Sequence, residues 1–221
     1  MADKLTGKKT IGIVGYCMLI LSLQAINVRT VEFILGERAV FGNGFISTKS
    51  LIVIVVIVTL IFWKAGLIDI DISPLKKLPK KREILISLGL AAAFMVILIL
   101  FRQVIQVFHP EIASRPFFRW YFMYHTRWFY PVNVVMQEAF IRFVVQDNLK
   151  KLEDESTKYA SLLLSGCFFA ALHMAYPWYM MIGTAFYCIA SGNFYGRYKC
   201  FWGLCILHFV GGFFPRCFGI I

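Results

Sequence analysis

Long apolar runs separated by short polar segments dominate this chain. A transmembrane helix needs about 20 mostly apolar residues to cross roughly 30 Å of hydrocarbon. The clearest candidates are Leu51–Trp63 and Ile84–Leu100, which contain no charged residue, whereas later runs carry Gly, His, Glu and Arg. The pattern predicts about seven spans, at residues 11–28, 46–68, 84–108, 128–146, 159–176, 178–194 and 200–220.

Composition supports a membrane protein. Of the 221 residues, 59% are hydrophobic and only 16% are charged, with a mean hydropathy of +0.71. Soluble domains are roughly 45–50% apolar and about 25% charged. A soluble globule, a disordered tail and a disulfide scaffold are therefore excluded, and the six cysteines lack metal-site or disulfide spacing. We predict an all-α polytopic transmembrane bundle that forms a single integral membrane domain over residues 1–221.

The net charge of +11 indicates topology rather than a nucleic-acid partner. Lys and Arg concentrate in cytoplasmic loops of membrane proteins, where they face anionic lipid. If seven spans alternate, most of the basic loop residues fall on one side together with the N-terminus. We therefore predict a cytoplasmic N-terminus and the lipid bilayer as a partner. The first apolar run is not followed by a small-x-small cleavage site, so we expect an uncleaved anchor.

Ionisable groups inside the predicted spans mark candidate functional residues. Each costs about 2.5–3.5 kcal/mol to insert, so such residues are functional candidates by default. Of the 12 acidic residues only Glu138 lies well inside a span, and Arg142 follows it at i+4 on the same helical face. His173 and His208 lie in two later apolar runs. Three predicted helices thus each carry polar groups, and the first of them also carries Gln137.

Several interpretations of these polar groups stay open. The Glu138–Arg142 pair could be a structural clamp, and each histidine a hydrogen-bonded core residue. A zinc site is a minor alternative, because there is no HExxH and the ligands would come from three helices; we predict no cofactor. A desolvated carboxylate is a suitable general base for water, and neighbouring histidines can stabilise an oxyanion. No GxSxG or phosphate-binding loop competes, so the set favours a non-covalent intramembrane peptidase.

Three segments resemble one protein family. Residues 137–142, Gln-Glu-Ala-Phe-Ile-Arg, resemble the EExxxR motif of the CPBP family, which comprises CAAX proteases and bacteriocin-processing enzymes and is also called Abi. Residues 169–173 fit the FxxxH motif of that family, about thirty residues downstream. Residues 196–202, leading to His208, resemble its basic turn before the last histidine. The family-like core covers about residues 128–214.

The resemblance implies an all-helical intramembrane glutamate protease. In that family a carboxylate and the first histidine activate water, and the second histidine binds the oxyanion together with an Asn four positions later. Carried over, the water-activating pair is the Gln137/Glu138 doublet with His173. Arg142 would orient the doublet, and His208 would be the oxyanion donor. The resemblance also implies a membrane-associated or lipidated peptide substrate and a bacterial plasma membrane.

Two positions depart from the family pattern. Gln137 replaces the first Glu of the doublet, and a neutral amide cannot take a proton from water. Gly212 stands at the position of the final Asn and offers no side chain to an oxyanion, a loss that typically costs about 10²–10³ in rate. An active endopeptidase and an inactive relative that binds peptides, or acts as an immunity or partner protein, both stay open. A small proton- or cation-coupled transporter subunit is a further alternative, although no inverted repeat supports it.

Overall fold

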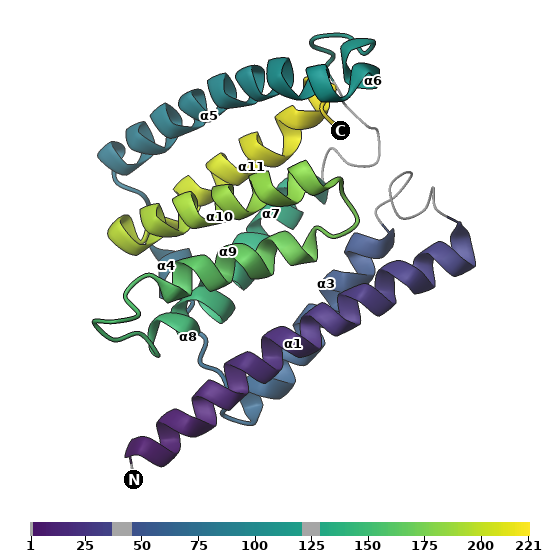
Figure 1. Ribbon diagram of the computed structural model, residues 1–221. Helices are drawn as coiled ribbons and strands as arrows, with labels where there is room; N and C mark the ends of the chain where they lie inside the picture. The colour runs from purple at the N-terminus through teal and green to yellow at the C-terminus, as the bar shows by residue number, and fades with distance from the viewer. Residues whose placement is uncertain (1, 37–45, 121–128) are drawn as a thin grey trace. The chain divides into compact units, whose positions relative to one another are not determined.

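The computed structural model describes residues 2–36, 46–120 and 129–221 (Figure 1). All regular secondary structure in these ranges is helical, which confirms the predicted all-α class. The chain groups into two compact units. The first unit comprises Met1–Ile72 and Ala139–Gly196, and the second comprises Ser73–Glu138 and Arg197–Ile221. The single membrane domain over the whole chain stays a prediction.

The first unit begins with two long antiparallel helices. Its elements are α1 (Ala2–Leu35), α3 (Ile46–Lys64), the π-helix η1 (Phe140–Gln146), α8 (Asp147–Lys150), α9 (Ala160–Leu172) and α10 (Trp178–Tyr198, whose residues up to Gly196 belong here). The Tyr16 hydroxyl of α1 lies 2.5 Å from the hydroxyl of Thr59 on α3. Further along α1, the Asn27 amide donates to the carbonyl of Ser47, near the start of α3, at 2.8 Å. The two contacts run in opposite directions along the two helices, so α1 and α3 lie antiparallel (Figure 1).

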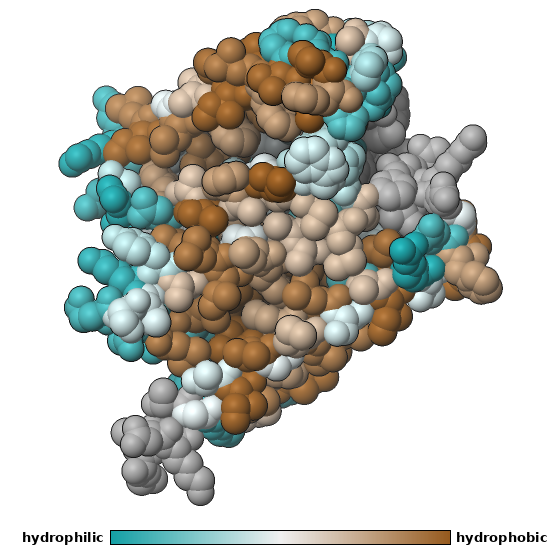
Figure 2. Space-filling view, viewed as in Figure 1, coloured by the Kyte–Doolittle hydropathy of each residue, from teal (hydrophilic) through white to brown (hydrophobic). Residues whose placement is uncertain are grey.

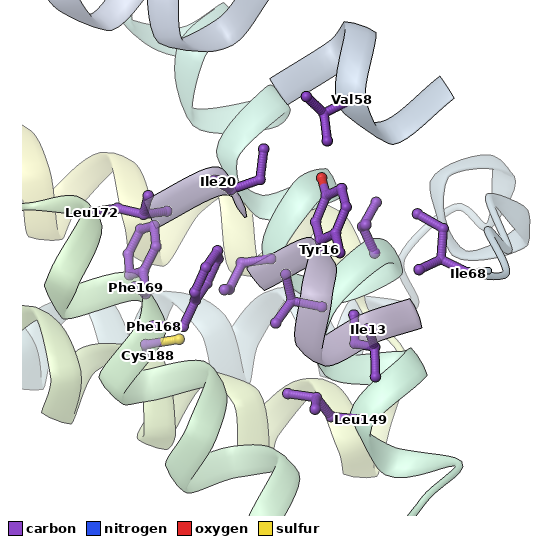
Figure 3. Close-up of a cluster of buried hydrophobic side chains, with 13 residues drawn as sticks. Ile13, Tyr16, Ile20, Val58, Ile68, Leu149, Phe168, Phe169, Leu172 and Cys188 are labelled. Atoms are coloured by element: carbon purple, nitrogen blue, oxygen red, sulfur yellow. The ribbon is translucent and has the colours of Figure 1, made fainter. Parts of the chain in front are cut away.

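A hydrophobic cluster holds α1 against the helices of residues 140–172 (Figure 3). The α1 residues of the cluster recur at helical spacing, which gives this helix one buried stripe. The fully or nearly fully buried members are Ile13, Tyr16, Ile20, Val58, Ile68, Ile141, Val144, Val145, Leu149, Phe168, Phe169, Leu172 and Cys188. Because η1 and α9 share this core, their positions in the first unit depend on α1.

Hydrogen bonds made by polar side chains also connect the helices of the first unit. Asn27 accepts a 2.6 Å hydrogen bond from Ser50 at its Oδ1 atom. Gln24, one turn earlier, donates to the carbonyl of Leu172, the last residue of α9, at 3.3 Å. In an apolar surrounding such hydrogen bonds add specificity to helix packing. Gln24 therefore ties α1 to the end of α9 that precedes His173.

Asp69 fastens the segment after α3 to two other parts of the first unit. Its Oδ2 atom accepts from Lys9 at 2.6 Å and from Lys151 at 2.9 Å. Its backbone N–H donates to Asn148 at 2.9 Å, and its carbonyl accepts from the Asn148 amide at 2.6 Å. The hydrogen bonds from Lys9 and Lys151 lower the pKa of the Asp69 carboxyl below its usual value.

We expect Asp69→Asn to lower the free energy of unfolding at pH 7 by about 0.5–1 kcal/mol, since the carboxylate is partly exposed and screened by solvent. A carboxyl whose folded-state pKa is lowered stabilises the fold above its unfolded pKa, and this contribution is lost as the pH falls through the folded pKa. Thermal unfolding in detergent at pH 7 and at about pH 3 measures the difference between the two proteins, which should become smaller at the lower pH. A difference that is unchanged at low pH would show that charge is not the cause. Glu155→Gln, in an exposed loop, serves as the control.

The second unit is built around two helices that lie side by side. Its elements are α4 (Ser73–Lys76), α5 (Lys81–Phe108), α6 (Pro110–Ala113), α7 (Phe129–Ala139, up to Glu138 in this unit) and α11 (Phe201–Cys217). Helices α5 and α11 pack along one another (Figure 1). A Cβ atom at Gly203 of α11 would collide with the Ser87 hydroxyl of α5. Small residues therefore allow the close approach of these helices, as is common in membranes.

Within the described residues, three helices are long and apolar enough to cross a membrane: Gly7–Leu35, Ile46–Lys64 and Lys81–Phe108. Exposed apolar side chains such as Leu85, Val96 and Leu100 cover α5, and hydrophobic residues are widespread on the surface seen in Figure 2. These findings support an integral membrane protein.

The remaining spans of the expected seven stay predictions, because the later helices are shorter, interrupted or less apolar. Helices α9 and α11 have 13 and 17 residues, which at 1.5 Å per residue gives about 20 and 26 Å, less than the hydrocarbon thickness. The described part of the predicted span at 128–146 is helical but changes from α to π geometry after Ala139. Polar residues such as Ser191 and Asn193 lower the hydropathy of α10, although its length would suffice.

Candidate active site

Glu138 and His208 form a buried pair in the second unit. Glu138, near the end of α7, is fully buried, and His208 on α11 is 7% exposed. The Nδ1 atom of His208 lies 2.8 Å from Oε1 of Glu138. When the carboxylate is ionised it can only accept, so Nδ1–H of the ring donates to it. This hydrogen bond fixes the ring orientation and, in the neutral ring, places the lone pair on Nε2.

Gln137 makes a local hydrogen bond on α7. Its Nε2 atom donates to Oδ1 of Asn133, one turn earlier, at 3.3 Å. Asn133 is buried and Gln137 is half-buried. Asn133 was not among the predicted site residues, because an amide inside an apolar run carries no charge to mark it.

Arg142 lies in a network of the first unit. It is fully buried and donates to Oε1 of Gln146 and to Oγ of Ser191, each at 2.7 Å, and to the Cys188 carbonyl at 3.3 Å. A Cβ atom at Gly192 would come within 2.9 Å of Nη1 of Arg142, so glycine makes room for the guanidinium.

Arg142 also lies in the seven-residue π-helix η1, where Asp147 N–H donates to the Arg142 carbonyl five residues earlier. Short π-helical segments often occur at functional sites. The boundary between the two units falls between Glu138 and Ala139. The predicted pairing of Arg142 with Glu138, and its role in orienting the doublet, therefore stay predictions.

His173 ends α9 rather than lying inside a helix. The predicted span reached residue 176, but α9 stops at Leu172 and His173 is its C-cap residue. Nδ1 of His173 lies 2.8 Å from the Phe169 carbonyl, which can only accept, so Nδ1 carries the proton and Nε2 the lone pair. The ring also packs edge-on against Phe169 at 4.7 Å between centroids. This tautomer suits a proton acceptor, while the convergence of His173 with Glu138 and His208 stays a prediction.

A metal centre was the minor alternative for these residues. Among the residues that the structure describes, no group of three or more His, Cys, Asp or Glu could hold a metal ion. A catalytic zinc site uses three protein ligands and a water, whereas the second unit brings together Glu138 and His208.

Comparison with known proteins matches part of the chain to one family. Residues 117–214 match the family described as type II CAAX prenyl endopeptidase Rce1-like. No curated protein and no solved structure matches the chain. The matched range contains Glu138, His173 and His208, and it begins before the core expected at residues 128–214. The Rce1-like match at residues 117–214 supports assignment of this part of the chain to the CPBP family of intramembrane CAAX proteases, and the long apolar helices support an integral membrane protein.

Proposed function

We propose that the protein is an intramembrane endopeptidase in which Glu138 and His208 activate water for peptide hydrolysis. The observation that supports this most strongly is the buried 2.8 Å contact between Nδ1 of His208 and Oε1 of Glu138. A carboxylate that accepts from one nitrogen of an imidazole fixes the tautomer and stabilises the positive ring once it is formed. The same arrangement suits water as the nucleophile in place of a side chain.

In the first step, water attacks the carbonyl carbon of the scissile amide. Nε2 of neutral His208 takes one proton from the water as its oxygen bonds to carbon. The π electrons of the carbonyl move to its oxygen and give a tetrahedral oxyanion. The step creates one positive charge on the imidazolium and one negative charge on the oxyanion, and the Glu138 carboxylate stabilises the imidazolium from its Nδ1 side.

In the second step, the oxyanion collapses and the carbon–nitrogen bond breaks. Nε2–H of His208 first donates a hydrogen bond to the oxyanion, then passes its proton to the departing amide nitrogen. The products are a carboxyl terminus and an amine, and His208 returns to its neutral form. His208 thus serves as proton acceptor and as the oxyanion donor that the family resemblance implies.

The other residues that match the family motifs would assist the reaction. Gln137 can hydrogen-bond the attacking water through its amide but cannot take its proton. His173 has an Nε2 lone pair, fixed by the bond from Nδ1 to the Phe169 carbonyl, and would be a second acceptor for water. Arg142 would keep the doublet oriented, as the resemblance implies.

The substrate that we propose is a membrane-associated or lipidated peptide. The matched family is described as CAAX prenyl endopeptidases, whose motif is a prenylated Cys followed by three C-terminal residues. We further propose a bacterial plasma membrane, as the family resemblance implies, and a cytoplasmic N-terminus, following the distribution of Lys and Arg. The mechanism uses no cofactor.

One observation favours a second function, an inactive relative that binds peptides. Gln137 occupies the first position of the doublet, and its amide donates a hydrogen bond to Asn133. An amide pair of this kind can recognise a peptide backbone without hydrolysing it.

A cleavage assay on a fluorogenic farnesylated CAAX peptide in liposomes separates these functions. We expect the protein to cleave the peptide, and Gln137→Glu to change kcat/KM by less than about tenfold, because the base is the Glu138–His208 pair. Adding 1,10-phenanthroline should not slow cleavage. Gln103→Glu, on the exposed surface of α5, controls for added charge.

Two results would contradict this expectation. Cleavage by Gln137→Glu alone would show that the base is a carboxylate at position 137. No cleavage by either protein, with binding of the peptide retained, would favour the inactive relative.

A further inference from the structure

The face of α11 that carries His208 has an unusual neighbour one turn further on. Gly212 follows His208 at i+4, so both positions lie on the same side of the helix. The space that a Cβ atom would need at Gly212 is occupied by the hydroxyl oxygen of Tyr130. The ring carbon that bears this hydroxyl would lie 3.0 Å from the same Cβ. Only glycine at position 212 lets the phenol approach α11 this closely.

Aromatic packing fixes the position of the Tyr130 hydroxyl. The Tyr130 ring contacts Phe209 and Phe213 of α11, with centroid distances of 5.8 and 6.5 Å. These two phenylalanines stack on one another at 5.3 Å and 14°. A tyrosine ring has only two side-chain torsions, so this packing leaves its hydroxyl little freedom. Packing alone would not require the oxygen, since a phenylalanine would make the same ring contacts without crowding Gly212.

Helix α7 therefore meets α11 twice at the candidate site. Near its end, Glu138 bonds to His208, and at its start, Tyr130 reaches Gly212. His208 and Gly212 are one helical turn apart, about 5.4 Å along the axis. An oxyanion is commonly bound by two donors, and tyrosine hydroxyls serve in this role in other enzymes.

We infer that Tyr130 is a catalytic residue whose hydroxyl donates the second hydrogen bond to the oxyanion, beside His208. The proton stays on the phenol throughout, and the hydrogen bond forms as the carbonyl oxygen gains charge. The hydroxyl thereby supplies from α7 the donor that a side chain at position 212 would supply from α11. This inference rests on the proposed hydrolysis at Glu138 and His208.

Tyr130→Phe tests the inference, because it removes only the oxygen. We expect kcat for the farnesylated peptide to fall by about 10²–10³ with KM and the unfolding temperature unchanged. Tyr159→Phe, at an exposed tyrosine before α9, is the matched control and should keep full activity. The inference is overturned if Tyr130→Phe keeps more than about a third of the activity while His208→Asn loses it.

Binding of a peptidyl phosphinate separates failure of this inference from failure of the proposed function. The phosphinate carries a tetrahedral anion in place of the scissile amide, and its Kd is compared with that of the parent peptide. We expect the unaltered protein to prefer the phosphinate and Tyr130→Phe to lose at least about tenfold of that preference. If the protein proves inactive but this loss is seen, the proposed function fails and the role of Tyr130 as a donor stands. An equal preference in the two proteins overturns the inference whether or not the peptide is cleaved.

Discussion

Replacing Glu138 with glutamine is expected to lower kcat/KM for peptide cleavage by about 10²–10⁴. Glutamine has the same shape, and its amide oxygen can still accept from Nδ1 of His208. It carries no negative charge, however, so the imidazolium that forms when Nε2 takes the water proton loses its balancing partner. The unfolding temperature should stay close to that of the unaltered protein, because the hydrogen bond between α7 and α11 is kept.

A double-mutant cycle makes this test specific. If Glu138 acts through His208, then Glu138→Gln combined with His208→Asn should be no slower than the slower single variant. Glu155→Gln, in an exposed loop, is the matched control and should keep full activity. If the fold-loss in kcat/KM of the double variant equals the product of the two single losses, the two residues act separately. A lower unfolding temperature with an unchanged rate per folded molecule would identify Glu138 as a structural clamp.

The long helices could be predicted because a long apolar run without charged residues is enough to indicate a membrane-spanning helix. Leu51–Trp63 and Ile84–Leu100 lie inside α3 and α5, as expected. The ends and interruptions of the later helices could not be predicted in this way. Helix α9 stops at Leu172, where His173 turns its ring back onto the Phe169 carbonyl, and this depends on a single hydrogen bond. The i+4 spacing of Glu138 and Arg142 predicted α-helix, whereas the backbone widens to π geometry from Phe140.

Candidate site residues could be identified from the sequence where an ionisable side chain lies in an apolar run, because burying its charge is costly. Glu138 and His208 were predicted because ionisable groups rarely lie inside apolar runs. Their direct pairing could not be predicted, since 70 positions separate them and no spacing rule covers contacts between distant helices. Gly212 was recognised only as a missing donor. Tyr130 lies at the end of an aromatic run that begins at Phe117, part of which lies outside the described residues. Such runs are typical of the membrane–water interface, so the sequence alone does not mark Tyr130 as a site residue.

Arg102 shows a further limit, because a buried arginine in α5 was not among the predicted functional residues. It is 2% exposed and donates to five backbone carbonyls of the second unit. The bonds from Nη1 and Nη2 range from 2.5 to 3.2 Å, and the acceptors are Ile112, Arg115, Pro116, Phe117 and Phe218. One guanidinium thus hydrogen-bonds carbonyls in α6, in the irregular segment after it, and at the residue that follows α11. All five contacts come from the Nη1 and Nη2 groups, whose four N–H donors in one planar fork are a property of arginine alone.

Arg102→Met should consequently lower the free energy of unfolding by about 3–5 kcal/mol, because it leaves buried carbonyls without a donor. Arg102→Lys should recover only part of this loss, since an ammonium offers three donors from one point. Thermal unfolding in detergent micelles measures both variants against Arg82→Met, an exposed arginine of the same helix that should change stability by less than about 0.5 kcal/mol. If Arg102→Met unfolds at the same temperature as Arg82→Met, water must reach these carbonyls. In that case the end of α11 is held by its packing on α5 rather than by the guanidinium, and the position of His208 does not depend on Arg102.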